Sequence, residues 1–369
     1  MSARTFYFAG GGTGGHIYPA IAVAEQLAEL EPEVRIHFFI SNRKIDSQIL
    51  SKTNFKYTIL QAEGFKLNTK VLIRFVSLFF KSCKLAKEII SASENPVVLG
   101  VGGFVAAPVC RVGFKLKVPV SLLNVDIVPG HANKLAARWA NEVFVQFRQT
   151  AEYFAKKGIR AKVVGCPLRS SFANPQPEKA KKELGLDENK KILLITGASS
   201  GSQNINEAAC SLLDRLENFA DDWQIVHLTG TGNFEKVKSK YVDAKISAKV
   251  LDYFDDMADL LAAADLVIGR SGAVSVAEYA AAGVPSICMP YPYHRDRHQY
   301  LNAGKLVEAE AAIIVDDLPD EKERADWLWE ELEQLLRSDA QRRQMKENCK
   351  ALAKLDAAST IAERLLQGI

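Results

Sequence analysis

The chain has 369 residues, more than one hydrophobic core usually holds, so two domains are expected. Its 48% hydrophobic and 25% charged residues exclude a largely disordered protein. The net charge of +3 conceals an asymmetry, because residues 1–164 carry 22 Lys and Arg against 11 Asp and Glu, whereas residues 165–369 carry 25 against 33. A basic first half predicts an anionic partner. The net charge leaves three classes of partner open: a nucleic acid, an anionic lipid and a phosphorylated substrate.

The six cysteines form no CxxC pair and no Cys/His spacing typical of a zinc site. Scattered thiols in a chain of this size favour a reducing cytoplasm. No run of about 18 apolar residues is present, so no segment is expected to span a membrane. The opening apolar run leads directly into glycines, which is not the pattern of a signal peptide.

Short apolar runs alternate with helical patterns in two series. The first series predicts strands at Thr5–Ala9, Val34–Ile40, Tyr57–Leu60, Pro96–Val101, Val118–Leu123, Glu142–Gln146 and Ala161–Val164. The second predicts strands at Lys191–Thr196, Trp223–Thr229, Lys249–Tyr253, Leu266–Ile268, Ser286–Met289 and Ala311–Val315. This alternation indicates two α/β domains with parallel sheets, at residues 1–164 and 165–344. The strand-free end, about residues 345–369, is expected to pack back on the first domain.

A loop of glycines, Gly10–Gly15, follows the first strand and precedes a helix, whose helical spacing is seen at Pro19–Leu30. It matches G-x-G-x-x-G, and its amides can face an anion. A dinucleotide site would need an acidic residue at the end of the second strand, but that strand ends in Ser41 and Asn42. Dinucleotide binding is therefore disfavoured, and a phosphate-binding loop or a simple tight turn remains.

His16 directly follows these glycines, in the first turn of the expected helix. A helix N-terminus disfavours imidazolium, so His16 is expected to be neutral and able to accept a proton. Two further loops, Gly100–Gly103 and Gly197–Ser202, also follow strands. In open α/β sheets, ligands bind at the carboxyl ends of the strands, where all three loops are expected.

Many hydrogen-bonding groups follow the strand Leu266–Ile268. The stretch Arg270–Glu278 enters a helix, and Gln299 and Asn302 come after the next strand. A carboxylate such as Glu278 can accept two vicinal hydroxyls of a ribose, and side-chain amides suit sugar hydroxyls. Glu278 alone fits a solvated helix face equally well, but with its neighbours it indicates a polar ligand.

Residues 66–87 combine apolar and basic side chains at helical spacing. The apolar face is Val71, Leu72, Phe75, Leu78 and Phe79, and Lys70, Arg74 and Lys81 are among the flanking bases. This pattern is typical of a helix lying in the interface of an anionic membrane, where each basic residue contributes about 1 kcal/mol. The alternative is an ordinary amphipathic helix packed on the first domain.

Four segments resemble the motifs of the MurG family, peripheral membrane N-acetylglucosaminyltransferases that convert lipid I to lipid II in peptidoglycan synthesis. They are GGTGGHIYPA at Gly11–Ala20, GVGGF at Gly100–Phe104, RSGAVSVAEYAAAGVP at Arg270–Pro285 and HQYLNA at His298–Ala303. The resemblance implies a GT-B fold, in which two Rossmann-like domains with parallel sheets face each other across a cleft. It implies a UDP-GlcNAc donor, inversion at the anomeric carbon, and neither an essential metal nor another cofactor.

The implied acceptor is undecaprenyl-linked MurNAc-pentapeptide, which receives GlcNAc on the C4 hydroxyl of MurNAc. The implied location is the cytoplasmic face of the inner membrane, bound peripherally to its anionic surface. No nucleic acid partner is implied, and a cell-wall synthesis complex would supply any protein partners.

The resemblance also assigns roles residue by residue. On the first domain, His16 is the general base, and Thr13, Gly14 and Gly15 lie by the donor sugar and diphosphate. Gly103 is also assigned to the substrate-binding site. Arg169 and Ser199 hold phosphate, and Phe254 faces uracil through its backbone. The nucleotide is lined by Arg270, Ser271, Gly272, Ala273, Val274, Ser275, Val276, Ala277 and Glu278, with Glu278 on the ribose hydroxyls. Gln299 reads the GlcNAc hydroxyls, and Asn302 supports that loop.

Two stretches depart from the family pattern. Where the family shows His-Glu-Gln-Asn, this chain reads Leu123-Asn124-Val125-Asp126, so Asp126 replaces an asparagine credited with sugar contact. Asp126 can accept hydrogen bonds or serve as the base in place of His16. The Gly197–Ser202 loop departs from the usual GGSQG. Two other functions stay open: a related enzyme acting on another lipid, and a membrane-bound sugar-nucleotide sensor without catalytic activity.

Overall fold

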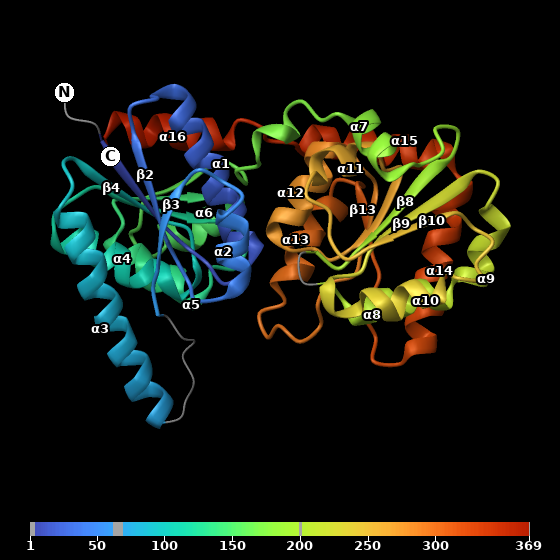
Figure 1. The fold of residues 1–369 in the computed structure, drawn as a ribbon, viewed down its shortest axis with the longest axis horizontal. Coiled ribbons are helices and arrows are strands. Elements are labelled where there is room, and N and C mark those ends of the chain that lie inside the picture. Colours follow the sequence, from blue (N-terminus) through green and yellow to red (C-terminus); the bar gives the residue numbers. More distant parts are fainter. Residues whose placement is uncertain (1–3, 62–68, 199–200, 369) are drawn as a thin grey trace. The chain divides into compact units, whose positions relative to one another are not determined.

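The computed structural model describes residues 4–61, 69–198 and 201–368. The chain forms two compact units (Figure 1). Unit 1 comprises Met1–Arg169 and Asp356–Ile369, and unit 2 comprises Ser170–Leu355. The sequence placed the domain boundary at residue 164 and the start of the returning segment near 345. By their contacts, Arg169 lies in unit 1 and residues 345–355 lie in unit 2.

Unit 1 contains one parallel sheet of seven strands, in the order β3-β2-β1-β4-β5-β6-β7. Its strands are β1 Thr5–Ala9, β2 Arg35–Ile40, β3 Lys56–Ile59, β4 Pro96–Gly100, β5 Val120–Asn124, β6 Glu142–Val145 and β7 Ala161–Val163. Every residue of β1, β5 and β6 is buried, as expected for central strands covered by helices on both faces. The predicted strands of the first series are thus confirmed.

The helices of unit 1 are α1 Gly14–Leu30, α2 Lys44–Leu50, α3 Thr69–Ser91, α4 Gly103–Lys115, α5 His131–Ala136, α6 Arg148–Ala155 and α16 Ala357–Gln367. Helix α1 begins at Gly14, so His16 lies in its first turn as expected, and Pro19 lies inside the helix. The C-terminal helix α16 packs beside α1 (Figure 1). Arg364 of α16 donates to the buried carboxylate of Glu142 at 3.0 Å, which ties the end of the chain to β6.

Unit 2 contains a second parallel sheet of six strands, in the order β10-β9-β8-β11-β12-β13. The strands are β8 Lys191–Thr196, β9 Trp223–Leu228, β10 Ala248–Leu251, β11 Leu266–Gly269, β12 Ser286–Cys288 and β13 Ala312–Ile314. The helices are α7 Pro177–Leu184, α8 Gln203–Ser211, α9 Leu213–Leu216, α10 Phe234–Lys240, α11 Met257–Ala263, α12 Ala273–Ala282, α13 His298–Val307, α14 Glu321–Arg337 and α15 Asp339–Leu352. The second predicted strand series is confirmed as well.

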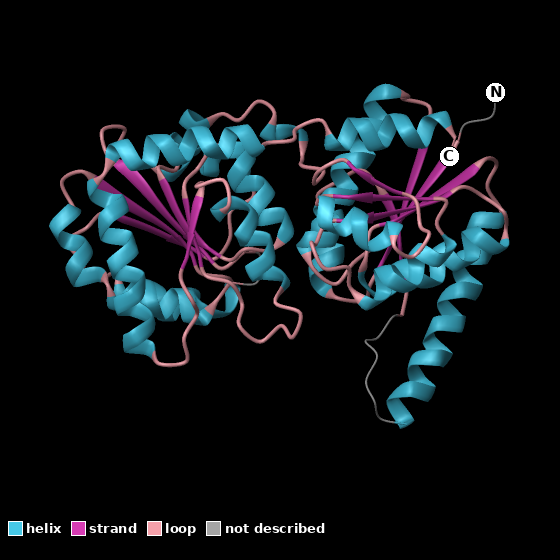
Figure 2. Cartoon of the chain, turned by 180° about the vertical axis from the view of Figure 1, so that it is seen from behind, coloured by secondary structure: helices cyan, strands magenta, loops and turns pink. Residues whose placement is uncertain are grey.

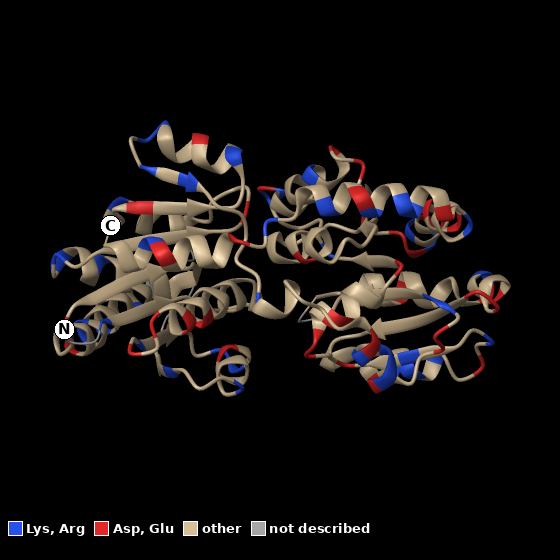
Figure 3. Cartoon of the chain, turned by 90° about the horizontal axis from the view of Figure 1, so that it is seen from above, with Lys and Arg blue, Asp and Glu red and all other residues tan. Residues whose placement is uncertain are grey.

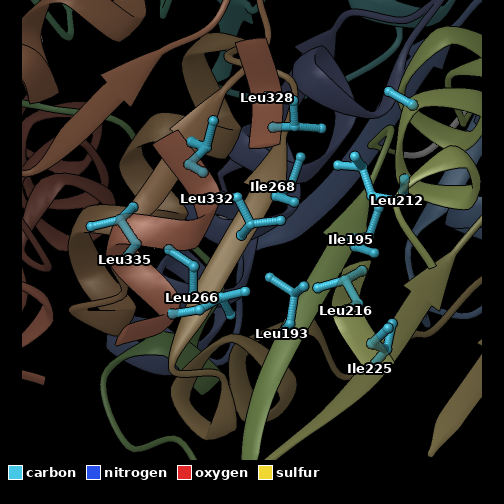
Figure 4. Close-up of a cluster of buried hydrophobic side chains, with 14 of the residues drawn as sticks. Leu193, Ile195, Leu212, Leu216, Ile225, Leu266, Ile268, Leu328, Leu332 and Leu335 are labelled. Carbon is cyan, nitrogen blue, oxygen red and sulfur yellow. The ribbon is translucent and has the colours of Figure 1, made fainter. Parts of the chain in front are cut away.

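The core of unit 2 forms between the sheet and its covering helices (Figure 4). Ile195 of β8 and Ile268 of β11 are almost completely buried, and α14 adds Leu328, Leu332 and Leu335. These leucines are spaced by four and three residues, so they share one face of the helix. Burying each such side chain contributes roughly 1.5–3 kcal/mol.

Helices cover both faces of each parallel sheet (Figure 2). Charged residues lie mostly on helices and loops, with few on strands (Figure 3). Because all strands of a sheet run parallel, the loops that follow them emerge at one edge. The three Gly-rich loops of the sequence therefore lie at the carboxyl edges, two in unit 1 and one in unit 2.

Candidate active site

A buried carboxylate fixes the first Gly-rich loop. Asp46, on α2, is fully buried and accepts hydrogen bonds from the backbone N–H of Gly12 at 2.8 and 3.0 Å. It also accepts from the hydroxyl of Ser41 at 2.5 Å and from the backbone N–H of Ser41 at 3.2 Å. Gly11 packs so close to Asp46 that a side chain there would collide with the carboxylate. The amide of Gly12 is therefore occupied by the protein itself.

His16 lies in the first turn of α1, which begins at Gly14 after the N-cap residue Thr13. Its Nδ1 is 3.3 Å from the hydroxyl of Thr13. Burial lowers the pKa of His16 below the ordinary 6.5, although attraction to the carboxylates of Asp126 and Asp46 opposes the shift. His16 is thus neutral at pH 7, the state that a proton acceptor needs.

The second Gly-rich loop packs against the first and against His16. Gly102 has φ of +126°, and a Cβ there would lie 2.5 Å from Cδ2 and 2.8 Å from Nε2 of His16. Gly103 starts α4 with φ of +73°, and a Cβ there would collide with the carbonyl oxygen of Gly11. Glycine is required at both positions by conformation and by space. The two loops therefore fix the imidazole between them.

The segment after β5 carries the departure from the family pattern. Asn124 is buried and donates through Nδ2 to the carbonyl of Asp126 at 2.6 Å, while its Oδ1 accepts from Asn133 at 2.9 Å. Thr150 secures the same turn by donating to the carbonyl of Ile127 at 2.8 Å. Asp126 itself is half-buried. Its influence on the pKa of His16 places the two competing candidate bases in one site.

Arg169, the last residue of the first segment of unit 1, lies against α1. Its guanidinium carbon is 4.7 Å from the ring centroid of Tyr18, two residues after His16. This cation–π contact holds a half-buried positive charge on the same helix that carries the histidine. Unit 1 thus brings together Thr13, Gly14, Gly15, His16, Gly103 and Asp126, and Arg169 contacts the same helix two residues beyond His16.

In unit 2, Arg270 follows β11 and is buried. Its Nη1 donates to the carbonyl of Met289 at 2.7 Å, and its Nη2 donates to the hydroxyl of Ser202 at 2.7 Å. The same Nη2 forms an ion pair with Asp317 at 2.8 Å. Arg270, predicted to line the nucleotide, is therefore engaged with protein groups from three loops.

Helix α12 follows with Gly272 as its N-cap. Ser271, Ala273 and Val276 are buried, whereas Gly272, Val274, Ser275, Ala277 and Glu278 are half-buried. The buried Tyr279 donates its hydroxyl to the carbonyl of Arg270 at 3.1 Å, which fixes the helix against the loop that precedes it. The half-buried group includes Glu278, so its carboxylate remains partly accessible.

The N-terminal part of α13 holds the predicted sugar-reading residues. Gln299 accepts through Oε1 from the backbone N–H of Tyr291 at 2.9 Å, and its carbonyl accepts from the hydroxyl of Ser271 at 3.0 Å. Asn302 is completely buried and donates to the carbonyl of Ser271 at 3.3 Å. These contacts join α13 to the loop after β11.

Two remaining predicted residues lie at other strand ends. Phe254 is buried in the loop between β10 and α11. Ser199 lies outside the described residues. The neighbouring Gly201 has φ of +71°, and Ser202 caps α8 by accepting from the backbone N–H of Ile205 at 3.4 Å. Across the described ranges 4–61, 69–198 and 201–368, no three His, Cys, Asp or Glu residues gather to hold a metal ion.

Helix α3, the expected membrane helix, extends away from the rest of unit 1 (Figure 1). Of its predicted apolar face, Phe75, Leu78 and Phe79 are half-buried, and the side chains of Lys70, Val71 and Leu72 lie outside the described part. Arg74 and Lys81 are exposed. The most exposed apolar residues are Ile73 at 72%, Phe80 at 54% and Val76 at 42%, which the sequence analysis left out.

A basic cavity of about 560 Å³ lies between α3 and α4. Phe80 lines it together with Lys84, Lys87, Arg111 and Lys115. The Arg111 guanidinium lies 5.4 Å from the ring centroid of Phe80. No helix within the described residues is sufficiently long and apolar to cross a bilayer.

The sequence analysis did not identify Asp46, Asn133 and Asp317. Each acts through contacts with distant segments, which no local pattern reveals. Asp46 is the clearest case, because an acidic residue was sought at the end of β2, whereas Asp46 lies in the first turn of α2.

Comparison with known proteins agrees with this architecture. The glycosyltransferase family 28 N-terminal domain matches residues 6–145, and the C-terminal domain of the same family matches residues 192–363. The crystal structure of MurG from Acinetobacter baumannii is similar over 100% of both chains, with a TM-score of 0.73 and 25% identity. UDP-GlcNAc 2-epimerase from Neisseria meningitidis shares only the fold, with a TM-score of 0.70 and 14% identity, over 99% of this chain and 100% of its own.

Curated relatives are closer in sequence. A UDP-N-acetylglucosamine–N-acetylmuramyl-(pentapeptide) pyrophosphoryl-undecaprenol N-acetylglucosamine transferase from Thermodesulfovibrio yellowstonii is 35% identical over 84% of each chain. The protein of the same name from Acetivibrio thermocellus is 32% identical over 96% of this chain and 95% of its own. With a GT-B α/β fold and relatives at this level of identity, the chain belongs to the MurG family of N-acetylglucosamine transferases.

Proposed function

We propose that this protein transfers GlcNAc from UDP-GlcNAc to the C4 hydroxyl of MurNAc in undecaprenyl-diphosphate-linked MurNAc-pentapeptide, converting lipid I to lipid II. The observation that carries the proposal is the neutral His16, held between two Gly-rich loops beside Asp126, in a chain that belongs to the MurG family. The relatives' name states the same donor, acceptor and transferred group.

In unit 1, His16 serves as the general base. One ring N–H of His16 is bonded to the backbone carbonyl of Gly11, and the hydroxyl of Thr13 lies 3.3 Å from Nδ1, so the ring nitrogen that donates no proton carries the lone pair. Glycine at position 102 leaves the imidazole the space that a side chain would fill. The acceptor oxygen attacks the anomeric carbon of GlcNAc, the bond from that carbon to the diphosphate breaks, and the proton passes to His16. This single displacement inverts the anomeric configuration.

Asp126 supports the imidazolium that forms during this step, because a nearby carboxylate stabilises positive charge on the ring. It replaces the family's asparagine as an acceptor for a sugar hydroxyl. A base role for Asp126 is the alternative, and the variants described in the Discussion separate the two.

Unit 2 binds the donor. Glu278 accepts the two ribose hydroxyls, the backbone near Phe254 pairs with uracil, and Gln299 reads the GlcNAc hydroxyls while Asn302 holds its helix in place. The amides at the N-termini of α8 and α12 stabilise the leaving UDP. In unit 1, Arg169 supplies a positive charge for phosphate. Neither a metal nor another cofactor takes part, so activity is expected to survive EDTA.

The proposed location is the cytoplasmic face of the membrane, with the α3–α4 surface as the contact. Exposed Ile73, Val76 and Phe80 supply apolar area, and the bases around the cavity face anionic headgroups. Replacing Ile73 and Phe80 by serine is expected to reduce co-sedimentation with vesicles containing anionic lipid. Tyr57→Ser, an exposed aromatic on β3, is the control; an equal loss in both proteins would contradict the assignment.

The direct test of the activity is UDP release from UDP-GlcNAc, measured with and without a lipid I analogue. Release that requires the analogue supports the transferase. Release with another lipid hydroxyl but not with the analogue would indicate a related transferase, and UDP-GlcNAc binding without release would indicate a sensor.

A further inference from the structure

A buried carboxylate, Asp317, links the loops at the carboxyl edge of the unit 2 sheet. It lies between β13 and α14 and is 3% exposed. Its Oδ2 is 2.8 Å from Nη2 of Arg270, and its Oδ1 accepts from Nδ2 of Asn204 at 2.7 Å. No sequence motif marks it, and the reaction described above does not use it.

These contacts reach the N-terminus of α8 by two routes. Asn204 belongs to the first turn of α8, so Asp317 holds this turn directly. Arg270 bonds the hydroxyl of Ser202, which is the N-cap of the same helix, so Asp317 also acts through the arginine. The two routes fix the position and orientation of the helix terminus.

Two buried arginines lie on the buried carboxylate of Asp317. Arg324, on α14, is 3% exposed and lies 3.8 Å from both Asp317 and Glu207, the latter on α8. Glu207 is partly exposed and also pairs with Lys236 at 3.0 Å. Removing one member of a buried set leaves an uncompensated charge that must be resolved by movement. The arrangement is therefore rigid while it is complete.

We propose that Asp317 is a positioning residue for the donor diphosphate, acting through Arg270 to hold Ser202 and the N-terminus of α8. The inference rests on the proposed function, because it assumes that the terminus of α8 faces the diphosphate of UDP-GlcNAc. A helix N-terminus stabilises phosphate only within its first turn, so a small displacement matters. Arg270 keeps its guanidinium on protein acceptors and acts on the ligand through the loop.

The experiment measures UDP and uridine affinity by calorimetry, with no acceptor present. Asp317→Asn is expected to weaken UDP binding about tenfold or more, the cost of one charged contact, and to leave uridine binding within about twofold. A merely structural role would change both affinities together. Unchanged UDP affinity would overturn the proposal, and so would tighter binding, because that would mean a released Arg270 contacts phosphate directly.

Two further variants test whether the effect is specific to Asp317 and whether it passes through Arg270. Asp265→Asn is the matched control, because this carboxylate accepts from the backbone N–H of Ile192 at 2.9 Å at the opposite edge of the same sheet. Its UDP affinity is expected to remain that of the wild type. In the double variant Arg270→Gln/Asp317→Asn, the loss of UDP affinity is expected to stay within about threefold of that of the more severe single variant, because Asp317 acts through Arg270. Losses that multiply would contradict action through Arg270.

Ser202→Ala covers the case in which Asp317→Asn does not fold. It keeps the charges of Asp317, Arg270 and Arg324, and it removes the hydroxyl that Arg270 bonds and that caps α8. The same selective loss of UDP affinity is expected, and equal affinity with a folded protein would overturn the inference. A wild-type protein without UDP affinity would instead contradict the proposed function, so the two failures are distinguishable.

Discussion

The two units share one local design, a strand followed by a Gly-rich loop and a helix, but they stabilise the loop differently. In unit 1, Asp46 bonds the amide of Gly12 directly. In unit 2, Asp317 pairs with an arginine that in turn holds Ser202. The first arrangement uses up a loop amide and leaves a neutral histidine beside it. The second retains a positive charge near the helix terminus.

This difference indicates that the Gly-rich loops of the two units have different functions. A loop whose amide is bound to a carboxylate is a poor cradle for an anion, but it is a firm support for His16. In the loop of unit 2 the guanidinium bonds the hydroxyl of Ser202, so no backbone amide of the loop is used in this contact. Under the proposed function, the same Gly-rich pattern in sequence would serve proton transfer in unit 1 and phosphate binding in unit 2.

The largest expected effect is that of His16→Ala. Loss of a general base costs roughly 10²–10⁴ in kcat, while the affinity for UDP is expected to change little, because donor binding belongs to unit 2. Steady-state kinetics with UDP-GlcNAc and a lipid I analogue, together with calorimetry with UDP, measure both quantities. Asp126→Asn is the comparison variant; a loss in kcat larger than that of His16→Ala would assign the base to Asp126.

Asp46→Asn tests the support in unit 1. An amide cannot accept at both positions that now receive the Gly12 and Ser41 donors, so unit 1 is expected to lose about 2 kcal/mol of stability. Urea unfolding of the variant and the wild type measures the loss. Asp187→Asn, an exposed loop carboxylate of unit 2, is the control. Unchanged stability of Asp46→Asn would mean that the buried bonds contribute nothing net.

Glu278→Ala tests the nucleotide side of unit 2. Loss of hydrogen bonds from a charged acceptor is expected to raise KM for UDP-GlcNAc about tenfold, with kcat largely kept. The variant is also expected to lose discrimination between UDP and 2′-deoxy-UDP, measured as competitive inhibitors. Retained discrimination between UDP and 2′-deoxy-UDP would contradict a contact of Glu278 with the ribose and would indicate that Glu278 lies on a solvated helix face.

The smallest effect expected is in the pH profile. Because burial lowers the pKa of His16, the neutral base persists below pH 6.5, and kcat/KM is expected to stay level from pH 7.5 down to that value before it falls. The profile of kcat/KM from pH 5 to 8 measures this. A fall that begins above pH 7 would require a raised pKa and would mean that the attraction of Asp126 outweighs burial.

Much of the fold could be predicted from the sequence because the signals are local. The strands were found from apolar runs, since parallel strands are buried on both faces and read as continuous hydrophobic stretches. Candidate site residues were predicted in the loops and helices that come after strands, as with His16 and Arg270. The first turn of α1 was predicted to contain His16, which agrees with a helix that begins at Gly14.

The exposed side chains of α3 could also be predicted only in part from local signals. Periodicity selected Phe75, Leu78 and Phe79, and these side chains are half-buried, whereas Ile73 and Phe80 are the more exposed ones. An apolar stripe marks the side of a helix that can be buried, but it does not say whether protein or lipid covers it. That depends on where α4 packs.

The sequence by itself determined two parallel α/β domains, three loops at the carboxyl edges of strands, and the side chains that can perform the chemistry. Only the tertiary structure decided how those loops are held. Asp46 and Asp317 come from segments that no motif marks, and they became partners of Gly12 and Arg270 because buried amides and charges must be satisfied. Local sequence patterns determine which helices and strands form. The need to satisfy buried amides and charges determines which residues from distant segments bond to them.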